Sequence, residues 1–389
     1  MKKKIKLAII GCGGMAGGHL NACRELKEKF DVFNLVATCD AVEEKAERFS
    51  EIAKEFQKGV KPKVFTDHRQ LLDKVKIDAA LIPSHHRSHH IIGIDCLLAG
   101  AHVMTEKPFA ITVKAGRKMI DTAKEAGKIA AVAENYRYDL SNRAIKFAID
   151  HGLIGKPQML FQGGVGGALN AMLASTAWRH HKLEAGDGTI LDNGVHDSDL
   201  FYYFLGDVDE VYGTTFRFDD VRYRRDDKGN VTETTYNDCN EGGFAILKFL
   251  NGVYGQWGPA YWAGHGEGAG YGRWIYGSEG VLKGSDIIRK DGTKENATKY
   301  FETHASDELK QKLFPLGLTN SVSLEVYGFL NCIQNGGTPE TDGEIGLKAL
   351  SIAYSLIESS CLNVPVKVKD VEDGKIEVWQ KEINEDLGL

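Results

Sequence analysis

A segment in the second half of the chain carries a histidine and two aspartates at the spacing of one helix face. Asp192, His196 and Asp199 stand at positions i, i+4 and i+7, so a helix beginning near Thr189 places them on one side. An unperturbed histidine has a pKa of about 6.5 and can take a proton from a hydroxyl group near neutral pH. A carboxylate one turn away can fix the imidazole tautomer. The spacing fits a surface Asp–His pair equally well.

A lysine that could serve the same chemistry follows the apolar residues Val103-Met104, in the run Thr105-Glu106-Lys107-Pro108. We expect this run to end a buried strand. In a doubly wound sheet the carboxyl ends of the strands open into the ligand crevice, and Lys107 would point toward it. A lysine there can stabilise an alkoxide that develops on the substrate. The alternative is an ordinary exposed lysine at a strand end.

A glycine-rich turn near the start of the chain predicts a dinucleotide site. The residues Gly11-Cys12-Gly13-Gly14-Met15-Ala16 fit the pattern G-x-G-x-x-A between an apolar strand and a helix. The first two glycines permit a tight turn and the close approach of a pyrophosphate to the helix N-terminus. Asp40 closes the second strand, where a carboxylate accepts hydrogen bonds from the ribose of NAD and repels a 2′-phosphate. We therefore expect NAD rather than NADP, the alternative being a structural turn with a capping aspartate.

The elements that must position these groups alternate between strand and helix as far as about residue 135. The strand-like runs are Ile5–Ile10, Leu35–Cys39, Val64-Phe65, Ala79–Ile82, Val103-Met104 and Ile129–Ala133. This alternation predicts an α/β fold with an N-terminal doubly wound parallel (Rossmann) sheet. After residue 150, glycine-rich and aromatic-rich runs, with a two-residue hairpin turn at Asn251-Gly252, predict an α+β domain on a large, mostly antiparallel sheet. We expect a dinucleotide-binding domain over 1–137 and a substrate-binding and oligomerisation domain over 138–389.

The composition narrows the class of protein. The chain has 389 residues, 42% of them hydrophobic, and a net charge of −6, which argues against a nucleic-acid partner. The apolar run Leu7–Ile10 after the first lysines is too short for a signal peptide. We see no stretch near the ~20 apolar residues that span a bilayer. The 7 cysteines are scattered, as in a reducing compartment, and we expect a cytoplasmic protein without a membrane partner.

In this order the motifs resemble the Gfo/Idh/MocA family of NAD(P)-dependent sugar and inositol oxidoreductases. The resemblance is carried by Gly11–Ala16, Glu106-Lys107-Pro108, Asn135-Tyr136-Arg137, Trp178-Arg179, the run from Gly188 to Asp199, and Asp342-Gly343. It covers nearly the whole chain and implies that Lys107, Asp192 and His196 are the catalytic residues. One departure is the stretch from Pro83 to His89, which is longer than the family's Pro-x-x-x-His spacing.

The resemblance and the motifs together define the candidate site. The expected cofactor-binding residues are Gly11, Cys12, Gly13, Gly14, Met15, Ala16, Asp40, Pro83, Ser84, His89, Glu106, Lys107 and Asn135. The expected substrate-binding residues are Tyr136, Arg137, Trp178, Arg179, His180 and Asn193. The histidines His85-His86 and His89-His90 invite a metal interpretation, but we favour cofactor contact or helix capping and expect no metal site. The glycine-dense stretch Gly264–Gly272 suits either a substrate loop or a subunit contact.

The expected activity is the NAD-dependent oxidation of a secondary hydroxyl group of a sugar, glycoside or inositol, by hydride transfer to nicotinamide. One alternative is an enzyme that retains its NAD and oxidises a glycoside transiently, either to exchange hydrides or to permit cleavage. A second is an NAD-sensing regulator without catalysis, which need not keep Lys107, Asp192 and His196 together. The resemblance implies a homodimer or homotetramer. The sequence does not indicate which carbohydrate, which carbon or which direction.

Overall fold

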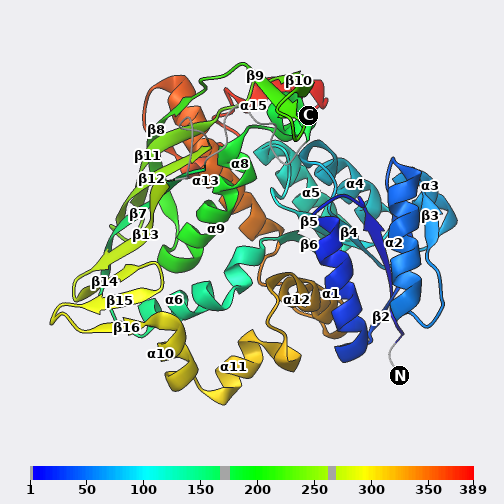
Figure 1. The fold of residues 1–389 in the computed structure, drawn as a ribbon, viewed down its shortest axis with the longest axis horizontal. Helices are drawn as coiled ribbons and strands as arrows, with labels where there is room; N and C mark the ends of the chain where they lie inside the picture. The colour runs from blue at the N-terminus through cyan, green and yellow to red at the C-terminus, as the bar shows by residue number, and fades with distance from the viewer. Residues whose placement is uncertain (1–2, 167–175, 262–268) are drawn as a thin grey trace. The chain divides into compact units, whose positions relative to one another are not determined.

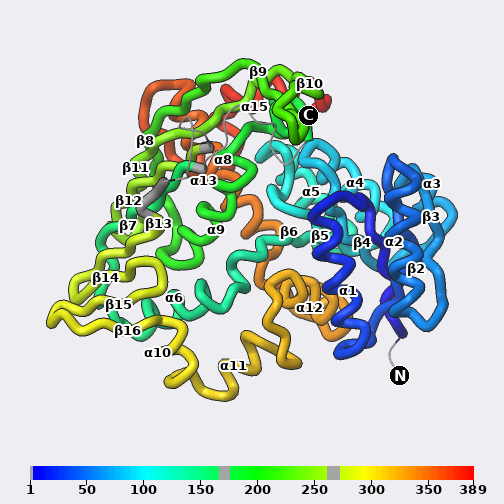
Figure 2. The backbone as a smooth tube through the Cα atoms, viewed as in Figure 1, coloured from blue at the N-terminus to red at the C-terminus, as the bar shows by residue number. Residues whose placement is uncertain are grey.

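The computed structural model describes residues 3–166, 176–261 and 269–389 (Figures 1 and 2). The chain forms two compact units, each of which we describe by itself. The first unit comprises Met1–Ile111, Ala115–Asp139 and Ser306–Leu347, and the second comprises Thr112–Lys114, Leu140–Ala305 and Lys348–Leu389. The units therefore interleave along the chain: Ser306–Leu347 packs within the first unit, although the sequence pattern assigns everything after residue 137 to the second domain.

The first unit is built on a parallel sheet with the strand order β3-β2-β1-β4-β5-β6. Its strands are β1 (Ile5–Ile10), β2 (Phe33–Cys39), β3 (Lys63–Phe65), β4 (Ala79–Ile82), β5 (His102–Glu106) and β6 (Ala130–Ala133). The central strands are apolar and fully buried, as in Leu7, Ile9 and Leu81, because helices cover both faces of such a sheet. The predicted doubly wound parallel sheet is confirmed.

Most helices of this unit follow its strands along the chain, and three come from the later segment Ser306–Leu347. They are α1 (Ala16–Lys29), α2 (Glu43–Phe56), α3 (His68–Lys74), α4 (His86–Leu98), α5 (Val113–Ala126), η1 (Asn135–Tyr138), α11 (Asp307–Leu313), η4 (Pro315–Gly317) and α12 (Ser321–Asn335). Helix α12 packs beside α1, with Val326 and Phe329 in one buried cluster with Leu20 and Leu26. A segment from the C-terminal third thus completes the core around the first helix.

The second unit is built on a mixed sheet, nine-stranded in the described residues, with the order β16-β15-β14-β13-β7-β12-β11-β8-β17. Its strands are β7 (Pro157–Gly166), β8 (Val208–Phe216), β11 (Gly242–Phe249), β12 (Tyr254–Tyr261), β13 (Ala269–Gly277), β14 (Gly280–Lys283), β15 (Asp286–Arg289), β16 (Lys294–Asn296) and β17 (Val366–Lys367). Strands β9 (Val221–Arg225) and β10 (Val231–Tyr236) form a separate hairpin. Among the described residues, only the β7–β12 pair of the large sheet is parallel, so the predicted mostly antiparallel sheet is confirmed.

The predicted two-residue turn at Asn251-Gly252 is longer in the structure. The amide of Phe249 donates to the carbonyl of Val253 over 2.9 Å, which closes a loop of Leu250, Asn251 and Gly252. Gly252 has a φ of +89°, and the Asn251 side chain accepts a hydrogen bond from the Val253 amide. This is a three-residue hairpin with glycine at the left-handed position.

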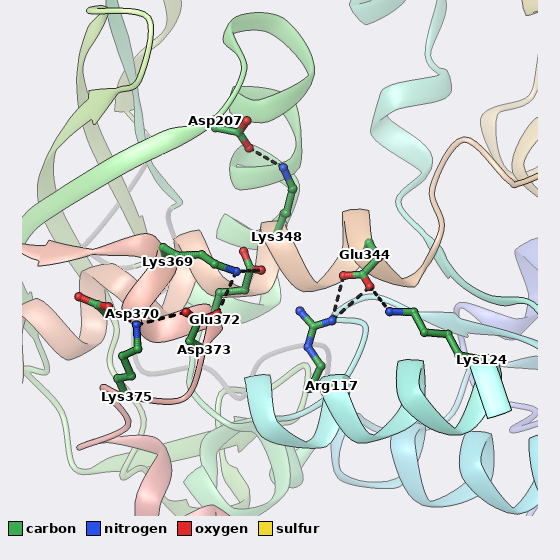
Figure 3. Close-up of polar contacts among 10 residues, drawn as sticks. All are labelled: Arg117, Lys124, Asp207, Glu344, Lys348, Lys369, Asp370, Glu372, Asp373 and Lys375. Atoms are coloured by element: carbon green, nitrogen blue, oxygen red, sulfur yellow. Dashed lines mark hydrogen bonds and ion pairs between the residues drawn. The ribbon is translucent and has the colours of Figure 1, made fainter.

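The helices of the second unit are α6 (Leu140–Asp150), η3 (Ala177–His180), α7 (Lys182–Ala185), α8 (Thr189–Asp192), α9 (Gly194–Leu205), α10 (Ala297–His304), α13 (Gly343–Leu362), α14 (Val368–Glu372) and α15 (Gln380–Asp386). The first turn of α13 belongs to the first unit. There Arg117 and Lys124 pair with Glu344, at 3.1 and 2.8 Å. Farther along α13, within the second unit, Lys348 pairs with Asp207 (Figure 3).

Helix α13 concerns the prediction that no stretch of the chain is long and apolar enough to span a membrane. Among the described residues it is long and apolar enough to span a bilayer by length and composition, so the expectation was too strict. However, 72% of its apolar window is buried inside the protein. A core helix passes the same test.

Candidate active site

The candidate cofactor residues of the first unit lie at the carboxyl edge of the parallel sheet. Gly11 follows β1, Asp40 follows β2, Pro83 follows β4, Lys107 follows β5, and Asn135 begins η1 just after β6. Since the strands run parallel, these five positions meet at the same edge, where ligands bind in open α/β sheets. The sheet therefore brings together groups spread over more than a hundred residues of sequence.

The glycine turn combines one tightly enclosed position with an open surface. Gly11 has a φ of +103°, and a Cβ atom there would lie 2.8 Å from the backbone of Pro83. At Gly13 and Gly14 a Cβ would meet no atom within 4 Å. Gly11 is thus required by the fold, whereas the open space beside the next two glycines at the start of α1 fits a pyrophosphate group.

Asp40 lies directly beside this turn. Its Oδ2 accepts a hydrogen bond from the Cys12 amide at 2.7 Å, and its Oδ1 accepts one from the Val42 amide at 2.9 Å. The Cys12 side chain is fully buried, and burial raises the pKa of its thiol to about 12, with a smaller contribution from the Asp40 charge. Cys12 therefore contributes its backbone rather than a reactive thiol. Met15 is partly exposed and Ala16 is buried.

His89 connects two of the strand ends rather than belonging to a metal cluster. Its Nδ1 lies 2.8 Å from the Pro108 carbonyl oxygen, and its Nε2 lies 3.1 Å from the Ser84 carbonyl oxygen. Burial lowers the pKa of this imidazole, so the ring is neutral and carries one N–H, which it donates to one of the two carbonyl oxygen atoms. The ring nevertheless lies between the loop after β4 and the Glu106-Lys107-Pro108 run. The ring nitrogens of His85 to His90 do not form a metal-ligand group in the described structure.

The Glu106-Lys107 pair lies over a buried polar cluster that the sequence analysis missed. Glu106 is buried; its Oε1 lies 2.9 Å from Nε2 of His19 on α1, and its Oε2 accepts a hydrogen bond from the Lys107 amide. Beyond β6, Asn135 donates to the Ser321 hydroxyl at 3.5 Å. Tyr136 is exposed and Arg137 is buried. No sequence pattern links His19 to Glu106, because their contact depends on the packing of α1 over β5.

In the second unit the predicted single helix from Thr189 is broken. Helix α8 ends at Asp192, Asn193 lies between the helices, and α9 begins at Gly194. Gly194 packs against Trp257, and a Cβ there would lie 2.8 Å from the indole ring. Asp192 and His196 thus belong to consecutive helices, and the predicted single continuous helix is wrong.

Asp192 instead meets a residue of the predicted substrate set. Arg179 Nη1 donates to Asp192 Oδ1 at 2.5 Å, and the Arg179 guanidinium stacks 4.5 Å from the ring centroid of Trp178. His180 is buried, and its burial and the nearby Arg222 charge lower its pKa to about 4. The structure thus brings Trp178, Arg179 and Asp192 together, while His180 turns into the interior.

His196 is buried at the start of α9 beside an aspartate that the sequence analysis did not select. The carboxylate of Asp197 accepts hydrogen bonds from Gln162 Nε2 and Trp257 Nε1, both at 3.0 Å. Burial raises the pKa of Asp197 despite the nearby Arg273 charge. Two strands, β7 and β12, therefore fix the turn that carries His196. The missed signal is the Gln162–Trp257 pair, which only the parallel β7–β12 register brings together.

Lys107 belongs to the first unit and Asp192 and His196 to the second, so each is placed by its own unit. The glycine-dense stretch from Gly264 lies outside the described residues as far as residue 268. Its remaining residues open strand β13.

Family models match both halves of the chain. Residues 5–134 match an oxidoreductase family with an NAD-binding Rossmann fold, and residues 142–283 match the GFO/IDH/MocA C-terminal domain. The chain belongs to the Gfo/Idh/MocA family of oxidoreductases, as the motifs predict. Its N-terminal part is an NAD-binding Rossmann domain.

The relatives are named after reactions on carbohydrates and cyclitols. The 1,5-anhydro-D-fructose reductase of Ensifer adhaerens is 26% identical over 307 residues, covering 79% of this chain and 84% of the relative. The D-apiose dehydrogenase of Paraburkholderia graminis is 25% identical, with coverages of 95% and 91%. The myo-inositol 2-dehydrogenase of Thermotoga maritima is 23% identical, with coverages of 94% and 99%.

Among solved structures, levoglucosan dehydrogenase in complex with NADH superposes with a TM-score of 0.76 at 20% identity, covering 94% of this chain and 99% of the other. At that identity the likeness establishes the fold.

Proposed function

We propose that the protein is an NAD-dependent dehydrogenase that oxidises a secondary hydroxyl group of a sugar, glycoside or inositol. The observation that carries the proposal is the Asp40 carboxylate beside the open Gly13-Gly14 turn, at the sheet edge that also presents Lys107. A carboxylate at this place suits the ribose of NAD and disfavours a 2′-phosphate. The family relatives support carbohydrate or cyclitol substrates.

The cofactor residues named from the sequence would surround the bound dinucleotide. The backbone of Gly11 to Ala16 would hold the diphosphate at the start of α1, and Asp40 would hold the adenosine ribose. When bound, NAD supplies the acceptor for a hydride from the substrate carbon. The His89 ring lies between the carbonyl oxygen atoms of Ser84 and Pro108 and so connects the two loops.

Two side chains act on the substrate hydroxyl in this proposal. His196 accepts the hydroxyl proton, and Lys107 donates a hydrogen bond to the oxygen as negative charge develops on it. Asp192, held by Arg179, is the third residue that the motif assigns to this reaction. Tyr136, Arg137, Trp178 and Asn193 remain candidates for contacts to the other hydroxyl groups.

The test is spectrophotometric. Purified protein is mixed with NAD or NADP and with myo-inositol, glucose or simple β-glucosides, and nicotinamide absorbance is followed. Reduction of NAD in preference to NADP supports the proposal. Tightly bound NAD released on denaturation, with turnover that needs no added NAD, supports the retained-cofactor alternative. NAD binding without turnover of any polyol would favour the regulator.

We also propose a homo-oligomer formed through the exposed face of the large sheet. Tyr212 is paired across the strands with Ile246, so their side chains share one face, and Phe244 lies two residues along the same strand. All three are 44–56% exposed, while the alternate residues Ala245 and Leu247 are buried. An open apolar sheet face of this kind is suited to a subunit contact.

Ultracentrifugation tests this contact. Ile246→Glu should shift the protein toward the monomer, whereas Val60→Glu, at another exposed apolar position, should leave the mass unchanged. An unaltered mass of the Ile246 variant would remove this face from the contact. All seven cysteines are free thiols, which supports a cytoplasmic location that cell fractionation can check.

A further inference from the structure

A buried cluster in the first unit has the composition of a metal site. His19 on α1, Glu106 at the end of β5 and Glu325 on α12 each offer one ligand atom, and these atoms all lie within 4.8 Å of one another. Their exposed fractions are 1%, 6% and 0%. The cluster joins three elements that are far apart in the sequence, and its residues belong to one compact unit.

Glu325 is the residue that the protein alone leaves unexplained. Neither of its carboxylate oxygen atoms has a hydrogen-bond partner among the described residues. A buried carboxylate without a partner is costly, because it loses its water and gains nothing in exchange. A partner of opposite charge would remove that cost.

The distances suit a cation. Imidazole nitrogen and carboxylate oxygen bind zinc at about 2.0–2.2 Å, so two ligands on one ion lie roughly 3–3.5 Å apart in octahedral or tetrahedral geometry. His19 Nε2 and Glu106 Oε1 lie 2.9 Å apart. Imidazole with carboxylates is a ligand set of divalent transition metals rather than of calcium, which takes oxygen ligands alone.

We propose that His19, Glu106 and Glu325 bind one divalent transition-metal ion of the class of Zn²⁺ or Mn²⁺. The ion links α1, β5 and α12 through these three side chains, one of which, Glu106, directly precedes Lys107. It is a structural ion of the Rossmann unit, which does not depend on the proposed reaction. From the sequence no metal site is expected, since cofactor contact or helix capping is favoured for the histidines His85–His90, and these residues take no part here.

The experiment measures metal rather than turnover. Full-length protein is stripped with a chelator, dialysed against ZnCl₂ or MnCl₂, and analysed by plasma mass spectrometry and thermal melting. We expect one equivalent of one of the two metals per chain and a melting temperature several degrees higher with the metal. A Co²⁺-loaded sample should show ligand-field absorption bands.

The variants separate this site from surface binding. Glu325→Gln and His19→Gln should each weaken metal binding by tenfold or more and abolish the thermal shift. Glu358→Gln is the matched control: Glu358 is also a buried glutamate, but it accepts hydrogen bonds from the amides of Trp379 and Gln380, so its loss should leave metal binding intact. His85→Gln should also retain the bound equivalent.

Circular dichroism of each variant checks that it folds, and the two ligand variants are independent, so one misfolded protein does not decide the test. No bound metal in wild-type protein titrated at micromolar concentration would overturn the proposal. So would undiminished binding by a folded Glu325→Gln or His19→Gln protein. Each result can be obtained without any carbohydrate substrate, which keeps it separate from the proposed activity.

Discussion

The two units position their candidate catalytic groups in different ways. In the first unit, Lys107 and Asp40 each stand at the end of their own strand, and the parallel order of the sheet alone brings them to one edge. In the second unit, Asp192 relies on Arg179, and the turn that carries His196 relies on Gln162 and Trp257 through Asp197. Topology fixes the first set, whereas long-range side-chain contacts fix the second.

This difference predicts how the units respond to change. A strand end is placed by backbone pairing that does not involve its functional side chain, although the Asp40 side chain also accepts hydrogen bonds from the Cys12 and Val42 amides. A turn held by side-chain hydrogen bonds moves when any partner is removed. Substitutions at the strand ends of the first unit should therefore change either turnover or ligand binding. Substitutions around His196 should change turnover and substrate binding together.

The largest effect should come from the two groups proposed to act on the hydroxyl. Lys107→Ala should lower kcat by ~10²-fold or more, because the developing alkoxide loses its hydrogen bond, and His196→Asn by ~10²–10⁴-fold, because the general base is lost. Steady-state kinetics on the substrate that the absorbance assay identifies would measure both. If the two act on one oxygen, the double variant should lose less than the product of the single losses. Full additivity would separate their roles, and unchanged turnover of either variant would remove that residue from the mechanism.

Asp40 tests whether the strand end selects the cofactor. Asp40→Ala should weaken NAD binding by ~10–100-fold, the value of charge-assisted hydrogen bonds, while NADP binding improves relative to it. Calorimetric titration with both dinucleotides measures the ratio. Asp67 is the matched control, since it follows the neighbouring strand β3 but caps α3 through the Gln70 amide. Its alanine variant should lose stability without a change in that ratio, and an unchanged ratio in the Asp40 variant would contradict the assignment.

The glycine turn separates a fold requirement from a binding requirement. Gly11→Ala places a methyl group against the Pro83 backbone at a positive φ, and should lower the melting temperature by several degrees. Gly14→Ala meets no protein atom within 4 Å. It should melt within about a degree of wild type yet bind NAD roughly tenfold more weakly, a loss of about 1.4 kcal/mol. Equal effects of the two variants on both measurements would show that the turn does not divide in this way.

Much of the first unit could be predicted because its signals are local. Strand β1 runs from Ile5 to Ile10 as predicted, and the Gly11–Ala16 turn and Asp40 follow their strands directly. What the sequence could not show is the contribution of α12, since Glu325 meets His19 and Glu106 only after a segment from the C-terminal third packs beside α1. No local pattern contains that contact.

In the second unit the sequence motif was recognised, but the helix that carries it was predicted as one continuous helix rather than two. The spacing of Asp192, His196 and Asp199 favours one helix, yet the chain breaks at Asn193, where Gly194 makes room for Trp257. A close contact between residues so far apart along the chain overrides the helical periodicity. The partners Arg179 and Gln162 carry no spacing signal either, which is why the continuous helix was predicted wrongly. The roles of the site residues stay a prediction.

The smallest predicted effect is a pH dependence of stability that arises from Asp187 in the second unit. Asp187 is fully buried and accepts two hydrogen bonds from Asn240, and burial raises its pKa to about 7. Between pH 4 and 7 the folded chain therefore holds a proton that the unfolded chain releases, so the contribution of Asp187 to stability falls as the pH rises through this range and is lowest above it. Asp187→Asn keeps the accepting oxygen and cannot ionise. Its melting temperature should exceed that of wild type by a few degrees at pH 8, and the gain should shrink toward pH 4; Asp227→Asn, at an exposed position, should show no such trend. A difference that stays constant with pH would mean that folding does not raise the pKa of Asp187.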